Sequence, residues 1–184
     1  MKRKTDTEQM IDTLGKVFNK TMKVTKVAYK EAVKPESFDK GEDFQNFVKN
    51  MFPDYEWAVS SQTHDYNTNK ERFIEDSKNP DFLFRHRRSN REIYVECKFK
   101  SDTFHDKIEW CSISQLERYK RIDNQGHNVY IIIGFRGTAR NPELIFRIPL
   151  SEIPSKWTGL YLSWVDRYKI DKNHKFTLWE GKLK

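Results

Sequence analysis

The sequence is poor in the features that mark secreted, disulfide-bonded or membrane-spanning proteins. Its 184 residues include two cysteines, Cys97 and Cys111, which form neither a disulfide framework nor a paired-cysteine zinc pattern. No stretch approaches the roughly 20 apolar residues of a transmembrane helix. Met1-Lys2-Arg3-Lys4 is followed by polar residues rather than by the apolar run of a signal peptide. We therefore expect a cytoplasmic protein without a membrane span.

Common catalytic motifs are also missing. Glycine is scarce, and Gly134-Phe135-Arg136-Gly137 lacks the Lys-Ser/Thr end of a phosphate-binding loop. The five histidines show no metal-ligand spacing, and there is no GxSxG motif. These absences argue against hydrolysis by a side-chain nucleophile.

What the sequence has is positive charge and aromatic residues. Lysine and arginine total 34 against 27 acidic residues, which gives a net charge of +7, and 14% of the residues are aromatic. A chain of this length forms one domain, with room for an appendage. The excess of positive charge favours a polyanionic partner.

The appendage is predicted at residues 1–36, as a basic amphipathic helix over residues 7–34. Apolar residues recur on one face at helical spacing, and lysines recur on the opposite face. The apolar face holds Met10, Leu14, Val17, Phe18, Val24, Ala28 and Ala32, and the lysines are Lys16, Lys20, Lys23, Lys30 and Lys34. Three interpretations stay open: a helix packed on the domain, an arm on nucleic acid phosphates, or a membrane-surface or interaction helix.

Residues 37–184 form the predicted main domain, and its central feature is a β-hairpin. Residues 79–84 and 93–99 are rich in β-branched and aromatic residues, as strands are, and the polar segment 87–91 between them fits a tight connection. Because side chains alternate along a strand, Ile93, Val95, Cys97 and Phe99 share a core face, while Tyr94, Glu96 and Lys98 share the other.

The hairpin brings together groups that suit metal chemistry. Asp81 opens the first strand, so folding can place its carboxylate beside that of Glu96. Two close carboxylates repel each other unless a cation lies between them, and oxygen ligands suit Mg²⁺. Lys98 beside such a metal can position or activate a water, or stabilise charge on a phosphoryl oxygen. Lys98 also has a simpler interpretation, as part of a Glu-Lys pair on an ordinary strand.

Pro80-Asp81 followed by Glu96-Cys97-Lys98 resembles the PD-(D/E)xK nuclease superfamily, over roughly residues 41–150. The resemblance implies a restriction-endonuclease-like core, a Mg²⁺ cofactor that Mn²⁺ can replace, and the Cys97 carbonyl as a further metal ligand. It also implies DNA as the partner, with RNA as an alternative, and allows a homodimer for double-strand cleavage.

The first predicted helix, residues 39–52, departs from the family pattern. Gly41-Glu42-Asp43-Phe44-Gln45 resembles the family's first-helix motif, in which a glutamate often follows the phenylalanine and joins the metal site. Gln45 stands there instead, and its carbonyl can hold a metal-bound water. Glu42 lies on the same flank and is a substitute metal ligand, although Asp39-x-x-Glu42 also fits a capping box.

Other candidates lie on the second helix and at the hairpin turn. In Gln115-Leu116-Glu117-Arg118-Tyr119, within a helix predicted over residues 112–122, Gln115 and Tyr119 are expected to line the cleft. Tyr119 and Gln45 are also predicted to contact nucleic acid. Arg85, Arg87 and Arg88 flank the turn, either as a solvated group or as a phosphate clamp beside the metal.

The sequence therefore predicts an α/β domain with a mixed sheet flanked by helices. Its further strands are residues 55–62, the apolar run 129–133 ended by a turn at Gly134 and Gly137, and residues 143–150; residues 64–78 and 100–110 are expected to be loops. The predicted function is a Mg²⁺-dependent endonuclease in which Asp81, Glu96, Lys98 and Gln115 are catalytic. The alternatives are an inactive nucleic-acid-binding module of the same fold, or a membrane-surface or interaction protein that uses the basic N-terminal helix.

Overall fold

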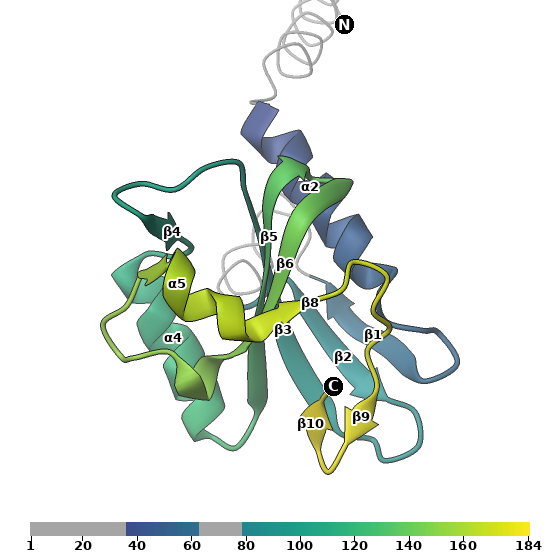
Figure 1. The fold of residues 1–184 in the computed structure, drawn as a ribbon. Coiled ribbons are helices and arrows are strands. Elements are labelled where there is room, and N and C mark those ends of the chain that lie inside the picture. Colours follow the sequence, from purple (N-terminus) through teal and green to yellow (C-terminus); the bar gives the residue numbers. More distant parts are fainter. Residues whose placement is uncertain (1–35, 63–78) are drawn as a thin grey trace, which may run out of the picture. The chain divides into compact units, whose positions relative to one another are not determined.

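The computed structural model describes residues 36–62 and 79–184 (Figure 1). The chain divides into two compact units, Met1–Asp39 and Lys40–Lys184. Of the first unit only residues 36–39 are described, so the helix predicted over 7–34 lies outside the described residues, as does the loop predicted over 64–78. None of the helices in the described ranges is both long and apolar enough to cross a membrane.

The second unit is built on a six-stranded sheet in the order β1-β2-β3-β5-β6-β8. The strands are β1 (Trp57–Gln62), β2 (Phe82–His86), β3 (Glu92–Lys100), β5 (Asn128–Thr138), β6 (Asn141–Pro149) and β8 (Lys169–Ile170). Neighbouring strands are antiparallel except β3 and β5, which are parallel and are joined through helix α4 (Ile113–Asn124). The predicted class, a mixed sheet flanked by helices, is confirmed.

The predicted β2–β3 hairpin is also confirmed. Phe82 pairs with Val95 and Arg85 with Glu92, so β2 begins beside the middle of β3. Strand β3 continues to Lys100, five residues past the last pair with β2. This offset places Asp81, directly before β2, next to the second half of β3.

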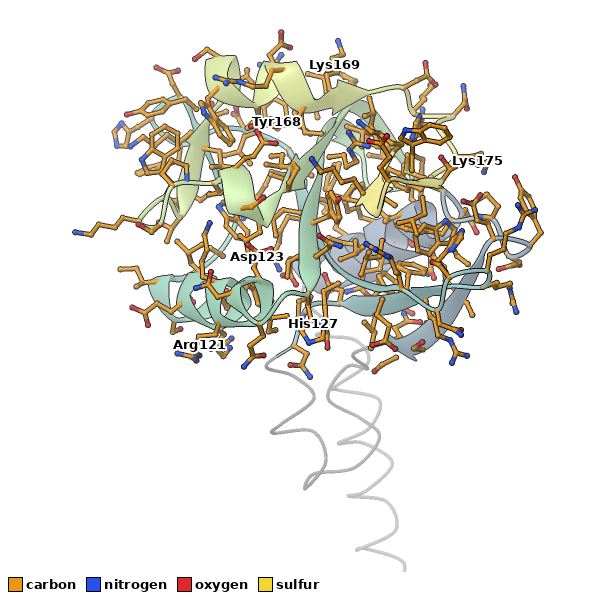
Figure 2. The ribbon with its side chains drawn as sticks, turned by 90° about the horizontal axis from the view of Figure 1, so that it is seen from below. Arg121, Asp123, His127, Tyr168, Lys169 and Lys175 are labelled. Atoms are coloured by element: carbon orange, nitrogen blue, oxygen red, sulfur yellow. The ribbon has the colours of Figure 1, made fainter. Side chains whose placement is uncertain are left out.

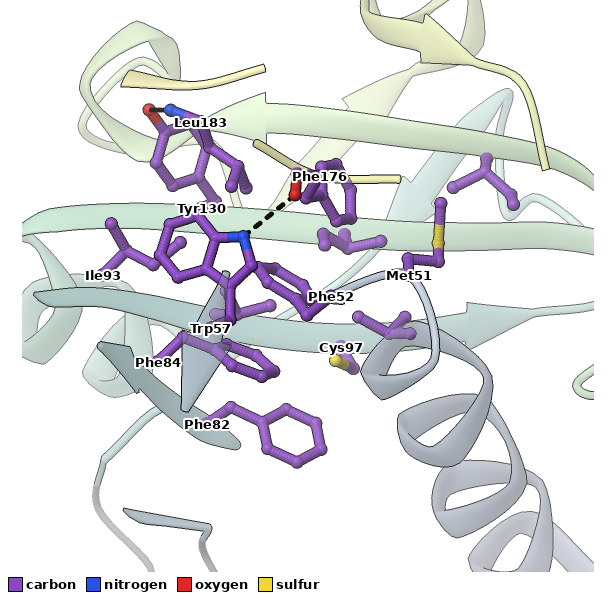
Figure 3. Packing of buried hydrophobic residues seen from close by; sticks show 14 of the residues in the cluster. Met51, Phe52, Trp57, Phe82, Phe84, Ile93, Cys97, Tyr130, Phe176 and Leu183 are labelled. Atoms are coloured by element: carbon purple, nitrogen blue, oxygen red, sulfur yellow. Dashed lines mark hydrogen bonds between the residues drawn. The ribbon is translucent and has the colours of Figure 1, made fainter. Parts of the chain in front are cut away.

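One face of the sheet packs against helix α2 (Glu36–Lys49). Phe44 and Val48 of the helix are buried together with Ile93, Val95 and Cys97 of β3, as the alternation along β3 predicts. Figure 3 shows this cluster, with the Trp57 indole N–H donating to the Phe176 carbonyl at 2.9 Å. Because α2 begins at Glu36, Asp39 lies inside the helix, and the predicted Asp39-x-x-Glu42 capping box is wrong.

The predicted turn at Gly134 is also wrong, because β5 runs through this residue to Thr138. An added Cβ at Gly134 would overlap the ring of Phe44, so glycine here lets α2 approach the sheet closely. The chain turns between Thr138 and Asn141 instead, and β6 then returns along β5. The continuous apolar run of β5 is buried on both faces, as expected for a central strand.

The other face of the sheet is covered by α4 and by the segments that surround it. Strand β4 (Lys107–Glu109) lies within the segment predicted as a loop over 100–110, and it pairs with β7 (Gly159–Tyr161) in a small two-stranded sheet. It is followed by α5 (Leu162–Val165), and short 3₁₀ turns lie at Leu150–Glu152 and Asp166–Tyr168. In Figure 2 Arg121 and Asp123 mark the last turn of α4, and His127 marks the connection to β5. A final hairpin pairs β9 (Leu178–Trp179) with β10 (Lys182–Leu183). It buries Leu183 in the cluster that holds Phe44 and Val48 of α2, which we call the α2-side core.

Candidate active site

Asp81 is held by both of its neighbouring elements. The backbone N–H of Cys97, on β3, donates to its Oδ2 at 2.7 Å. The side-chain amide of Gln45, on α2, donates to its Oδ1 at 3.0 Å. The sequence predicted that Asp81 approaches β3, and the structure adds that two donors fix the orientation of its carboxylate.

Glu96 lies on the opposite face of β3 from the α2-side core and is 2% exposed. Lys98, two residues along the same face, places its Nζ 2.6 Å from Glu96 Oε1. The hydroxyl of Tyr119, on α4, donates to Glu96 Oε2 at 2.8 Å. A buried carboxylate is costly unless it is paired and hydrogen-bonded, and here a separate donor binds each oxygen.

The two carboxylates affect each other electrostatically. Burial and the nearby Glu96 charge raise the pKa of Asp81 to about 7, against the opposing effects of Lys98 and of the Cys97 N–H. Burial by itself would lower the pKa of Lys98, but the Glu96 and Asp81 carboxylates outweigh it and raise that pKa above its ordinary value. Lys98 is therefore a firmly held positive charge between two acids.

These groups fit a divalent cation bound by oxygen. Burial first, and the charge of Glu96 second, raise the pKa of Asp81 to about 7, and a cation between the two carboxylates would offset both the burial of negative charge and the mutual repulsion. A strand residue points its N–H and C=O to the same side, so the Cys97 carbonyl faces the side on which its N–H meets Asp81. The Cys97 thiol belongs to the α2-side core, so only the backbone carbonyl of this residue is a candidate ligand.

The protein side-chain ligands would be few. In residues 36–62 and 79–184, no three His, Cys, Asp or Glu side chains gather closely enough to hold a metal ion. Glu42 is exposed on α2, and the contact to Asp81 comes from Gln45 instead. The structure therefore places Gln45 at Asp81 but does not place the Glu42 carboxylate with Asp81 and Glu96.

Gln115, predicted as catalytic, serves as a helix cap. Its backbone N–H donates to the Ser112 hydroxyl, and its side-chain oxygen accepts from the Ser112 backbone N–H at 3.1 Å. This reciprocal pair is a capping box at the start of α4. The Gln115 oxygen is thus committed to the helix end, and the prediction that this residue is catalytic finds no support in the contacts.

Tyr119, predicted to contact nucleic acid, is 2% exposed and cannot offer its ring to a base. That prediction is wrong, because the side chain points inward to Glu96. The pattern had placed Tyr119 on the correct side of the helix. The sequence could not show how closely α4 packs against β3, and therefore how deeply the Tyr119 side chain is buried.

The arginines of the hairpin turn do not flank the carboxylates. Arg85 follows Asp81 by four residues of extended chain, which is roughly 13 Å at about 3.3 Å per residue, and Arg87 and Arg88 lie beyond the end of β2. The Nε of Arg87 donates to the Asp54 carbonyl at 2.6 Å. The hairpin register pairs Arg85 with Glu92, at the end of the hairpin away from Glu96, so the contacts give no support to a phosphate clamp beside the carboxylates.

Cys111 is a neighbour of the site that the sequence did not reveal. Burial, with the charge of Glu96 as the second cause, raises the pKa of its thiol to about 12. The residue directly precedes Ser112, the N-cap of α4. In the sequence, the one indication of its place near the site is that Cys111 comes just before the helix that carries Tyr119. A single cysteine has no spacing pattern from which a role could be predicted.

Comparison with known proteins gives a distant structural match. Neither a family model nor a curated protein matches this chain. Among the solved structures that match is the Holliday junction resolvase Hjc from the archaeal hyperthermophile Archaeoglobus fulgidus. The similarity covers 72% of this chain and 93% of that chain, with 11% sequence identity and a TM-score of 0.44.

Proposed function

We propose that this protein is a divalent-metal-dependent nuclease that hydrolyses phosphodiester bonds in DNA. The observation that carries the proposal is the convergence of Asp81, Glu96 and Lys98 at one point of the sheet. An ammonium group lies 2.6 Å from a buried carboxylate, and the charge of that carboxylate contributes to raising the pKa of a second one. The net charge of +7 suits a polyanionic substrate.

Each residue has a role that follows from its contacts. Asp81, Glu96 and the Cys97 carbonyl would hold Mg²⁺ or Mn²⁺, which when bound supplies a Lewis acid for a phosphoryl oxygen and lowers the pKa of water. Gln45 orients Asp81, and Tyr119 orients Glu96. Both are positioning residues, since they act through the carboxylates.

Lys98 acts as a fixed positive charge rather than as a general base. Its raised pKa keeps the ammonium protonated at neutral pH, so it has no lone pair with which to accept a proton from water. Its N–H groups can orient the attacking water or bind a phosphoryl oxygen as negative charge develops there. The proton lost by the water must then pass to solvent or to a substrate oxygen.

The test is cleavage of supercoiled plasmid DNA, with Mg²⁺ and with EDTA. The site variant is Glu96→Ala and the matched control is Glu92→Ala, which removes an exposed carboxylate from the start of the same strand. We expect nicking or linearisation that needs the metal, persists in Glu92→Ala and disappears in Glu96→Ala. Equal cleavage by both variants would refute the assignment, and an RNA substrate run in parallel decides between the two nucleic acids.

A specific observation also favours a second candidate, an inactive nucleic-acid-binding module. All four oxygens of the two carboxylates already accept from or pair with protein groups: Gln45, the Cys97 N–H, Lys98 and Tyr119. In addition, Gln45 stands where the nucleases that this sequence resembles often have a glutamate. Salt-sensitive DNA binding without cleavage in Mg²⁺ or Mn²⁺ would establish this function in place of the nuclease.

A further inference from the structure

The turn that precedes β4 has an unusual backbone conformation. Phe104 and Lys107 exchange both backbone hydrogen bonds, at 2.9 and 3.1 Å, around the two residues His105 and Asp106. These two residues have φ of 48° and 58°. Two successive positive φ values define a type I′ hairpin turn, in which Asn-Gly or Asp-Gly is preferred. A histidine in the first position accepts backbone strain to form a tight, two-residue tip.

This tip displays an aromatic side chain to solvent. Phe104 is 63% exposed, and its ring meets the His105 ring edge-on with centroids 4.2 Å apart. Lys107 pairs with Tyr161 across β4 and β7, and its Nζ lies 4.6 Å from the centroid of the Tyr161 ring. Tyr161 is itself 41% exposed. The edge of the small sheet thus presents two aromatic rings with a cation at one of them.

The turn lies in the segment that connects β3, which carries Glu96 and Lys98, to α4, which carries Tyr119. Strand β3 ends at Lys100, two residues after Lys98, and Phe104 follows four residues later; Figure 1 shows the connection from β3 to β4. After β4 the chain reaches Cys111, whose thiol lies within the electrostatic influence of Glu96 and Lys98. The tip therefore projects from the connection between the strand that carries Glu96 and Lys98 and the helix that carries Tyr119, and the end of this connection at Cys111 lies near Glu96.

We propose that Phe104 and Tyr161 stack on unpaired bases of the nucleic acid next to the cleavage point. This inference rests on the proposed function and narrows its substrate class to DNA with a single-stranded segment, such as an overhang, flap or junction. Every base offers a π-face to an aromatic ring, whereas the bases of a blunt duplex are already stacked on one another. Lys107 supplies a positive charge for the adjacent phosphate.

The acidic residue in the turn affects which part of the nucleotide is favoured at the tip. The negative charge of Asp106 disfavours a phosphate beside it, and this favours a base at Phe104. Removing the carboxylate in Asp106→Gly keeps a residue that favours positive φ. We expect this variant to bind single strands as tightly as the wild type or more tightly.

The experiment measures binding without cleavage, by fluorescence anisotropy in EDTA with the Glu96→Ala variant as the parent. The probes are a labelled single-stranded oligonucleotide, a blunt duplex and the same duplex with an overhang. Phe104→Ala should weaken binding to the single strand and the overhang by roughly 5- to 150-fold. Binding to the blunt duplex should change little, and the salt dependence should be preserved because phenylalanine releases no counterions.

Tyr55→Ala is the matched control, because Tyr55 is an 80% exposed aromatic residue before β1 and outside the small sheet. Phe104→Trp should restore binding, since it restores a stacking surface. Equal losses in Phe104→Ala and Tyr55→Ala, or an equal loss on blunt duplex, would overturn the inference, as would a Phe104→Ala protein that binds all three probes like its parent.

The two proposals can fail separately, because the anisotropy assay contains no metal and needs no turnover. If the protein is not a nuclease, plasmid stays uncut while binding to single strands still depends on Phe104.

Discussion

Tyr119 donates its hydroxyl hydrogen to Glu96 from a helix that belongs to the crossover between β3 and β5. The donor–acceptor distance is 2.8 Å, and both side chains are buried. Lys98 binds the other carboxylate oxygen of Glu96 from the same strand. The rotamer of Glu96 is therefore set by one contact within the strand and one across the two layers of the fold.

Changing Tyr119 to phenylalanine removes only the hydroxyl of this contact. We expect cleavage to slow by about 10-fold or more with little change in KM, since the residue positions Glu96 and is itself too buried to reach substrate. The buried acceptor left behind should lower the free energy of unfolding by about 1–3 kcal/mol. Single-turnover kinetics and urea denaturation measure the two effects.

Tyr130→Phe separates positioning from stability in this experiment. The Tyr130 hydroxyl accepts from the Leu183 N–H at 2.9 Å and lies in the α2-side core. The Tyr130→Phe variant should lose a comparable amount of stability and should cleave at the wild-type rate. If both variants slow cleavage to the same extent, Tyr119 has no special part in the site.

Lys98→Ala should abolish most cleavage while leaving DNA binding intact. Loss of a preorganised charge at the reacting phosphate costs roughly 100-fold or more in rate, whereas Lys98 is already neutralised by Glu96 and adds little to phosphate attraction. Lys98→Arg retains the charge but changes the donor geometry, so it should fold like the wild type and still cleave poorly. Lys100→Ala, two residues along the same face, is the control, and unchanged cleavage by Lys98→Ala would remove Lys98 from the mechanism.

Gln45→Glu tests whether the first-helix position governs metal binding. The change removes the donor to Asp81 Oδ1 and adds a third negative charge, so without metal the protein should lose about 1–3 kcal/mol of stability. Mg²⁺ should raise the Tm of this variant more than that of the wild type. Glu42→Gln, at an exposed position of the same helix, should stay within about 0.5 kcal/mol of the wild type; a larger effect there than at Gln45 would favour Glu42 as the metal ligand.

The raised pKa of Asp81 predicts how the stability of the metal-free protein depends on pH. The pKa rises on folding from 3.8 to about 7, so the folded protein holds the proton more tightly than the unfolded chain does. The stability that depends on this proton is complete below pH 3.8 and is lost as pH rises through about 7.

Urea denaturation of the wild type and of Asp81→Asn, between pH 5 and pH 8 in EDTA, measures this contribution. As pH rises, the free energy of unfolding of the wild type should fall relative to that of Asp81→Asn. Mg²⁺ should reverse this fall at pH 8. A difference that is independent of pH would show that Asp81 ionises at its ordinary pKa.

The alternation of side chains along β3 was enough to predict much of the site. It assigned Ile93, Val95 and Cys97 to the core and Glu96 and Lys98 to the other face, and the hairpin brought Asp81 alongside. Both inferences depend on contacts within a short length of chain, where backbone geometry is fixed by the strand itself.

Contacts between distant segments were not predictable in the same way. The β4–β7 pair joins two three-residue strands whose sequence separation is large, so neither has a periodicity that can be detected. Gln115 was assigned to the cleft because helical spacing cannot distinguish a cleft residue from a cap. Gly134 was assigned to a turn because only the approach of Phe44 explains a glycine within the strand.

The parallel pairing of β3 with β5 has a consequence for how quickly activity appears during folding. The chain between these strands must close through β4 and α4 before the pairing can form, and such long closures slow folding relative to local hairpins. Asp81 can meet β3 early, because the hairpin is local, whereas Tyr119 reaches Glu96 only when the crossover has closed. After dilution from denaturant, strand and helix signals in circular dichroism should therefore recover first, and cleavage should recover in a later phase.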